Sequence, residues 1–194
     1  MTAEVSSVAP SQTPLPSRSV RLVRVGVLAV VGIVIAFSAT LHEQLGFDVA
    51  VAAVAVGAVG IAHVIEWISV RAAGGNTVPL LLGVIGILAA VALAFASTTI
   101  GFAIVIAAWA LANALLEFIG AATRPGTRQD ATLLGALGVL LAMLVLFVRE
   151  DQVAILGFLG TYAIIAAVFL GIAAFDHGRA AAKHPNNSAS ATQA

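Results

Sequence analysis

The sequence predicts an all-α, polytopic membrane protein with six transmembrane helices arranged as three helical hairpin repeats. Hydrophobic residues make up 61% of the chain and charged residues only 9%, whereas soluble domains carry about 25% charged residues. The stretch from Ala72 to Leu116 contains no Asp, Glu, Lys, Arg or His over 45 positions. One membrane-spanning helix needs roughly 20 apolar residues, so this stretch is expected to cross the bilayer and return.

The apolar segments are favoured as helices over barrel strands. Barrel strands alternate apolar and polar residues over about ten positions, but these segments are apolar on every side, and an α-helix satisfies its own backbone in lipid. Polar links separate them, and Pro79 suits the first turn of the third helix, because a missing N–H costs nothing there. We expect helices at about 25–40, 49–70, 78–96, 100–121, 131–148 and 152–175.

The two ends of the chain are polar. Residues 1–19 are rich in Ser, Pro and Thr, and residues 177–194 are similarly polar, so both are expected to be disordered cytoplasmic tails on either side of a transmembrane domain at 20–176. The basic residues before the first apolar segment could also belong to a signal peptide. The likeness of that segment to later ones favours a retained helix instead.

The basic residues predict the orientation. With six helices both tails lie on one side, and only Arg149 lies on the other. An excess of Lys and Arg marks the cytoplasmic side, so we expect a multi-pass protein of the plasma (inner) membrane with both termini cytoplasmic. The basic residues on the expected cytoplasmic side are Arg18, Arg21, Arg24, Arg71, Arg124, Arg128, Arg179 and Lys183.

The predicted hairpins resemble one another. Glu66-Trp67-Ile68 in one hairpin matches Glu117-Phe118-Ile119 in the next, which indicates a repeated two-helix unit. Glycines also recur three positions apart, on one helix face, where small residues allow close helix packing in lipid. A hinge in a broken transporter helix is the alternative role for such glycines. The expected packing glycines are Gly57, Gly60, Gly83, Gly86, Gly135, Gly138, Gly157 and Gly160.

The pattern resembles a known family. Six spans in three hairpins, a glycine-containing first helix in each hairpin, and the run Ala107-Ala108-Trp109-Ala110-Leu111-Ala112 in a second helix are similar to the HdeD-like acid-resistance membrane proteins, a short-repeat family of unknown function. The likeness covers about residues 18–176. It implies a non-enzymatic integral protein of the inner membrane that acts in acid or envelope stress tolerance, and it supplies no catalytic motif.

Two acids are expected within helices, Glu66 and Glu117, at equivalent places in two repeats. Each lies within two turns of the cytoplasmic end, and ionisable side chains at such depth are costly in lipid. In one interpretation each carboxylate pairs with a nearby arginine, Arg71 or Arg124, or stays protonated. In the other they form a proton- or cation-responsive pair, with His63 on the same helix face as Glu66 as a relay partner or half of a metal site.

Several activities and ligands are not expected. Nine basic and nine acidic residues give no basic footprint for nucleic acid. The chain has no cysteine and no HExxH motif, so no metal site, cofactor or enzymatic nucleophile is predicted. The expected partners are the lipid bilayer and either a second copy or other membrane proteins. The leading hypothesis is a non-enzymatic stress protein; the rival is a small proton- or cation-coupled transporter or channel, and an intramembrane enzyme has the least support.

Overall fold

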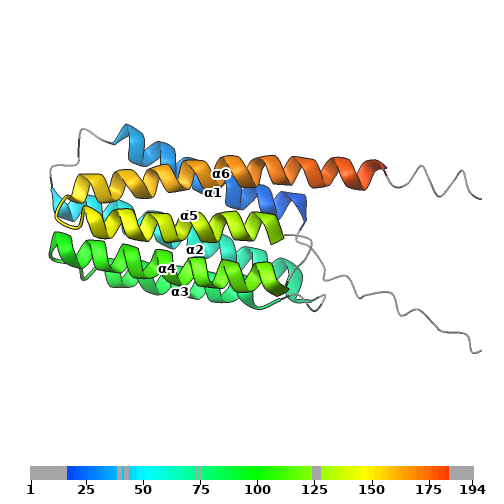
Figure 1. The fold of residues 1–194 in the computed structure, drawn as a ribbon, viewed down its shortest axis with the longest axis horizontal. Coiled ribbons are helices and arrows are strands. Elements are labelled where there is room, and N and C mark those ends of the chain that lie inside the picture. Colours follow the sequence, from blue (N-terminus) through cyan, green and yellow to red (C-terminus); the bar gives the residue numbers. More distant parts are fainter. Residues whose placement is uncertain are drawn as a thin grey trace, which may run out of the picture.

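The computed structural model confirms the all-α fold (Figure 1). The structure describes residues 17–38, 41, 44–72, 74, 76–123 and 128–183, with side chains described up to Phe175. These residues form six helices and no strand. The helices are α1 (Arg18–Phe37), α2 (Leu45–Arg71), α3 (Val78–Leu93), α4 (Thr99–Thr123), α5 (Arg128–Phe147) and α6 (Gln152–Lys183).

Every helix except α3 is long and apolar enough to cross a membrane, which makes the chain a multi-pass membrane protein. α3 is 16 residues long, or about 24 Å at 1.5 Å per residue. Its last turn continues in a tighter form, in which the N–H groups of Phe95 and Ala96 donate to the carbonyls of Ala92 and Leu93. With this turn, α3 approaches the roughly 30 Å thickness of the hydrocarbon core, although the helix itself ends at Leu93, three residues before the expected Ala96.

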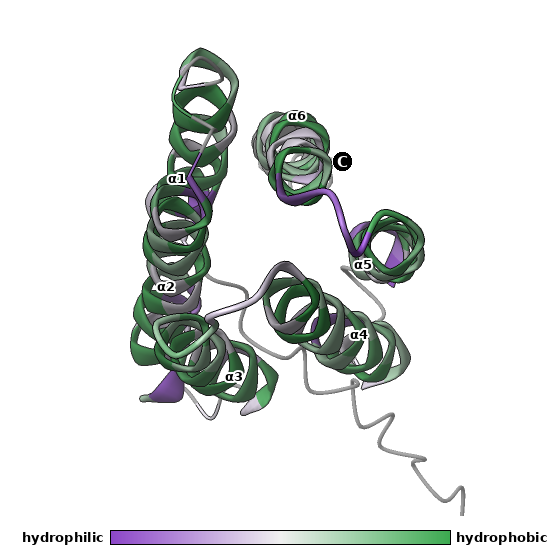
Figure 2. Ribbon diagram, turned by 90° about the vertical axis from the view of Figure 1, so that its left-hand side faces the viewer, coloured by the Kyte–Doolittle hydropathy of each residue, from purple (hydrophilic) through white to green (hydrophobic). Residues whose placement is uncertain are grey.

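The helices form a ring in chain order, and successive neighbours pack unequally. Figure 2 shows the ring end-on, with α2 between α1 and α3 and with α6 beside α5. The most extensive contacts are those of α2 with α3, α4 with α5, and α1 with α6, whereas α1 and α2 touch far less. The tight pairs therefore join consecutive predicted hairpins, and the α1–α6 pair closes the ring. α1 begins and α6 ends at the same end of the bundle (Figure 1).

Glycines lie where the tight pairs meet. A Cβ added to Gly60 of α2 would lie 2.9 Å from the carbonyl oxygen of Gly83 on α3, and one added to Gly86 would lie 2.9 Å from the Cα of Gly60. Between α5 and α4, a Cβ on Gly138 would lie 3.0 Å from the carbonyl oxygen of Ala110. Backbones can approach this closely only because no side chain stands between them.

The remaining expected glycines do not all lie in such contacts. Gly57, Gly135 and Gly160 each lie against a side chain of a neighbouring helix. Gly157 is exposed, and a Cβ there would meet no atom within 4 Å, so the expected close contact is wrong at this position. Gly32 of α1, outside the expected set, lies in the α1–α6 contact instead, where its added Cβ would be 3.0 Å from the carbonyl oxygen of Gly160.

Several helix ends differ from the expected ones, and three of them differ by four residues or more. α1 begins at Arg18 rather than near residue 25, because arginine is a good helix former and extends the apolar segment. α2 begins at Leu45 and places Asp48 in its first turn, fully buried; a carboxylate is favourable there because a helix N-terminus carries partial positive charge. α6 continues to Lys183, beyond the expected end at 175.

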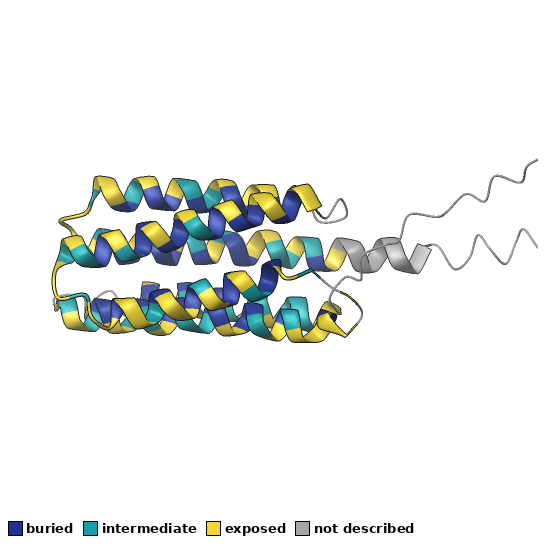
Figure 3. Ribbon diagram, turned by 90° about the horizontal axis from the view of Figure 1, so that it is seen from below, coloured by how far each residue is buried: buried dark blue, intermediate teal, exposed yellow. Residues whose placement is uncertain are grey.

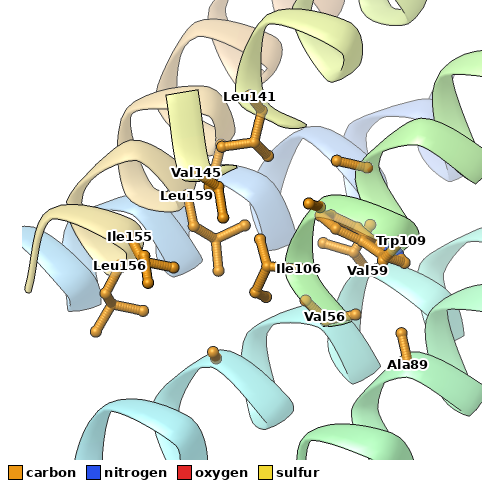
Figure 4. Packing of buried hydrophobic residues seen from close by; sticks show 14 of the residues in the cluster. Val56, Val59, Ala89, Ile106, Trp109, Leu141, Val145, Ile155, Leu156 and Leu159 are labelled. Carbon is orange, nitrogen blue, oxygen red and sulfur yellow. The ribbon is translucent and has the colours of Figure 1, made fainter. Parts of the chain in front are cut away.

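The outer surface of the bundle is apolar, as contact with lipid requires. Large hydrophobic side chains are exposed on every helix; Val54 of α2, for example, is 74% exposed. The buried positions lie on the inner faces of the helices (Figure 3). There, Ile106 and Trp109 of α4 belong to one cluster with Val56 of α2 and Leu159 of α6 (Figure 4).

Candidate functional site: a charged cluster inside the bundle

Three charged side chains from three helices meet inside the bundle. The guanidinium of Arg24 on α1 donates a hydrogen bond from Nη2 to Oε1 of Glu117 on α4, at 2.8 Å. Its Nη1 lies 3.6 Å from Oε2 of Glu66 on α2. The side chains of Arg24, Glu66 and Glu117 are 14%, 11% and 9% exposed. These three residues, called the ion cluster below, are therefore largely shielded, and Arg24 ties α1 to two other helices.

Two further titratable residues border the ion cluster. His63 is one turn before Glu66 on α2, and its Nδ1 lies 3.9 Å from Oε2 of Glu66, close enough for an ion pair when the imidazole is protonated. Tyr162 of α6 interacts electrostatically with Arg24 and Glu117. The ion cluster and these two neighbours thus come from four helices of the ring, α1, α2, α4 and α6.

The members of the ion cluster lie at a common depth. Arg24 is six residues from the start of α1, Glu66 is five from the end of α2, and Glu117 is six from the end of α4. At 1.5 Å per residue these positions are about 8–9 Å inside the helix ends. The alternating directions of the helices bring all three to one layer, near the end of the bundle at which α1 begins and α6 ends.

The formal charges of the ion cluster do not cancel. One guanidinium faces two carboxylates, which leaves one unit of negative charge in excess when both carboxylates are ionised and His63 is neutral. A buried charge without compensation is expensive. A proton or another cation bound at this place would restore neutrality.

The neighbouring helices contribute little further charge. α3 carries no Asp, Glu, Lys, Arg, His or Tyr, and the charged residues of α5 lie in its first turn. Asn113, one turn before Glu117 on α4, is buried, and its Oδ1 accepts no hydrogen bond from the described residues. The part of the chain that the structure describes holds no group of three His, Cys, Asp or Glu side chains placed to bind a metal ion.

The structure brings together the three predicted residues, Glu66, Glu117 and His63, but with a different arginine. The expected pairing of Glu66 with Arg71 is wrong: the guanidinium of Arg71 lies over the ring of Trp67, 5.3 Å from its centre. The other expected partner, Arg124, lies outside the described residues. Among the described residues, the arginine that pairs with both acids is Arg24, which the sequence had suggested as part of a basic flank on the cytoplasmic side.

A helical pattern in the sequence could have revealed Arg24. Continued backwards from the apolar segment, the buried face of α1 runs through Ile35, Gly32 and Leu28 at intervals of three and four residues. The next position on that face is Arg24. An arginine in register with a buried face needs an acidic partner, because an unpaired charge is not stable there. The hydropathy pattern alone does not say which acid supplies that partner.

Comparison with known proteins returned no relative: no family model, curated protein or solved structure matches the chain. The resemblance to the HdeD-like group therefore stays a prediction. Any function must be argued from the ion cluster and from the bundle around it.

Proposed function

We propose that this chain is a non-enzymatic, multi-pass protein of the plasma (inner) membrane, with both termini cytoplasmic, that resembles the HdeD-like group and acts in acid or envelope stress tolerance. In this proposal the three hairpins are copies of one unit, and the ion cluster is the element that responds to protons. The observation that carries the proposal is that the two buried carboxylates of Glu66 and Glu117 share the single guanidinium of Arg24.

Acidification acts on this cluster in two steps. The first proton removes the excess negative charge and leaves Arg24 balanced against one remaining carboxylate or against a His63–Glu66 pair. Further protons neutralise the carboxylates that hold Arg24, which leaves the guanidinium buried without a partner. The attachment of α1 to α2 and α4 at this end of the bundle therefore weakens at low pH. That change is the proposed signal to partners, which include a second copy of the chain or other membrane proteins.

The interior beyond the ion cluster supports a proton-responsive protein over a conduction path. Val56 lies ten residues before Glu66 on α2, and Ile106 lies eleven before Glu117 on α4, so both are about 15 Å further into the bundle. Their side chains are 1% and 0% exposed and belong to a continuous apolar core. Ions do not cross such a layer without water or polar groups.

A small proton- or cation-coupled transporter or channel that uses Glu66 and Glu117 is the second candidate. The observation in its favour is the excess negative charge of the ion cluster, which a cation could balance in place of a proton. Transport would require the apolar layer at Val56 and Ile106 to open in another conformation. Proteoliposomes separate the two candidates, because proton or cation flux that is lost in Glu66→Gln and Glu117→Gln would establish transport.

Proton uptake by the ion cluster can be measured directly. Lowering the pH of the reconstituted protein should produce the infrared absorption of a protonated carboxylic acid, and Glu66→Gln and Glu117→Gln should each reduce it. Asp130→Asn is the matched control, because Asp130 lies in the first turn of α5, outside the cluster. An acid-induced signal that is the same in both cluster variants as in the unchanged protein would refute proton binding at this site.

The physiological part of the proposal has its own test. A strain that lacks the protein should grow more slowly in acid than its parent, and the unchanged protein should restore growth. The variant with both Glu66→Gln and Glu117→Gln should be present in the membrane but should not restore it. Full restoration by this variant would separate the ion cluster from acid tolerance.

A further inference from the structure

A long apolar groove runs between α1 and α2, with a volume of about 560 Å³. Residues between Val23 and Ile35 line it on α1, and residues between Phe47 and Ala58 line it on α2. The groove exists because α1 packs mainly on α6 and α2 mainly on α3, which leaves the two helices loosely joined to each other. Small residues on its walls, such as Gly26 and Ala50, widen it further.

We propose that this groove binds an acyl chain of a membrane phospholipid. Its lining consists only of Gly, Ala, Val, Ile and Phe side chains, so it offers no polar side chain to a polar ligand. The groove also faces the bilayer, since Val30 of α1 and Val54 of α2, both on its walls, are 59% and 74% exposed. A hydrocarbon chain is the ligand that such a surface selects in a membrane.

The length of the groove argues for an acyl chain over a transmembrane helix. On α1 the lining from Val23 to Ile35 spans twelve residue steps, or about 18 Å. The groove is therefore only a little longer than half of the roughly 30 Å hydrocarbon core, which suits the length of one acyl chain. A helix of a second copy would cross both leaflets and would need a contact surface about twice as long.

Photochemical labelling in nanodiscs tests this proposal. A phospholipid with a photoactivatable diazirine in one acyl chain is incorporated and irradiated, and the labelled peptides are mapped by mass spectrometry. We expect labelling of residues 23–35 and 47–58 to exceed that of other lipid-facing segments several-fold. The double variant Gly26→Leu/Ala50→Phe, which fills the groove, should remove this enrichment. Ala108→Phe, at an exposed position on α4 outside the groove, should leave it unchanged.

Other occupants give different results. Even labelling of all lipid-facing segments would show that the groove holds no acyl chain preferentially and would overturn the proposal. Single-cysteine variants at Val30 and Val54 test whether a second copy of the chain lies against the groove. The chain has no natural cysteine that could form a competing disulfide. Efficient disulfide formation between copies at these positions would assign the groove to a protein interface and would likewise overturn it. If the filled variant fails to fold, the labelling map and the cysteine variants still decide the question.

Discussion

Replacing Arg24 by methionine should lower the free energy of unfolding by about 3–5 kcal/mol, the range for breaking a buried ion pair by removing one partner. The reason is that Glu66 and Glu117 would remain inside the bundle with no guanidinium between them. The measurement is unfolding by a denaturing detergent or by heat in bicelles, followed by circular dichroism.

Arg18→Met is the control for Arg24→Met. Arg18 is also an arginine of α1, but it is exposed at the start of the helix and lies over the ring of Phe175, 4.6 Å from its centre. Contacts of this exposed kind contribute about 0.5–1 kcal/mol. Equal losses in the two variants would mean that the position of Arg24 inside the bundle has no special importance and that the ion cluster does not hold the helices together.

Replacing Gly60 by valine should be among the most damaging changes at the packing glycines. A Cβ there would lie 2.9 Å from the carbonyl oxygen of Gly83 and 3.0 Å from the backbone nitrogen of Ile87. These are backbone atoms and cannot rotate away, so α2 and α3 would have to separate. Overpacking of this kind costs about 1–3 kcal/mol and occasionally more, and thermal unfolding in detergent measures it.

Gly157→Val supplies the comparison for Gly60→Val. It makes the same chemical change on an exposed face of α6, where an added Cβ would meet no atom within 4 Å. Its stability should stay within about 0.5 kcal/mol of the unchanged protein, as for other surface substitutions. If Gly157→Val were as destabilising as Gly60→Val, helix propensity or valine branching would explain the loss, and close packing of α2 on α3 would not.

The fold could be predicted from the sequence because lipid imposes a simple requirement on composition. A segment such as Ala72–Leu116, uncharged over a length that fits two spans, has few alternatives to a helical pair. Glycine spacing also predicted contacts at Gly60 and Gly83, but it failed at Gly157, because spacing identifies a helix face without showing whether another helix covers it. Which faces are covered depends on the ring arrangement.

The candidate site could be predicted only in part. Glu66 and Glu117 are conspicuous in the sequence because acids are rare in apolar segments. Arg24 was not conspicuous in the same way, because it follows Arg18 and Arg21 in a basic segment that also fits a flank on the cytoplasmic side. It lies 42 positions before Glu66 and 93 before Glu117, and only the packing of α1 in the closed ring brings the guanidinium to both acids.

The coupling between Arg24 and Glu117 tests the account most directly. Unfolding free energies of the unchanged protein, Arg24→Met, Glu117→Gln and the double variant form a double-mutant cycle. We expect a coupling of about 1–3 kcal/mol, as for residues in direct contact, with Glu117→Gln costing less once Arg24 is gone. The same cycle with Glu66→Gln should give a smaller coupling, because that pair lies at 3.6 Å rather than 2.8 Å. Additive losses in the Arg24–Glu117 cycle would contradict the existence of the ion cluster.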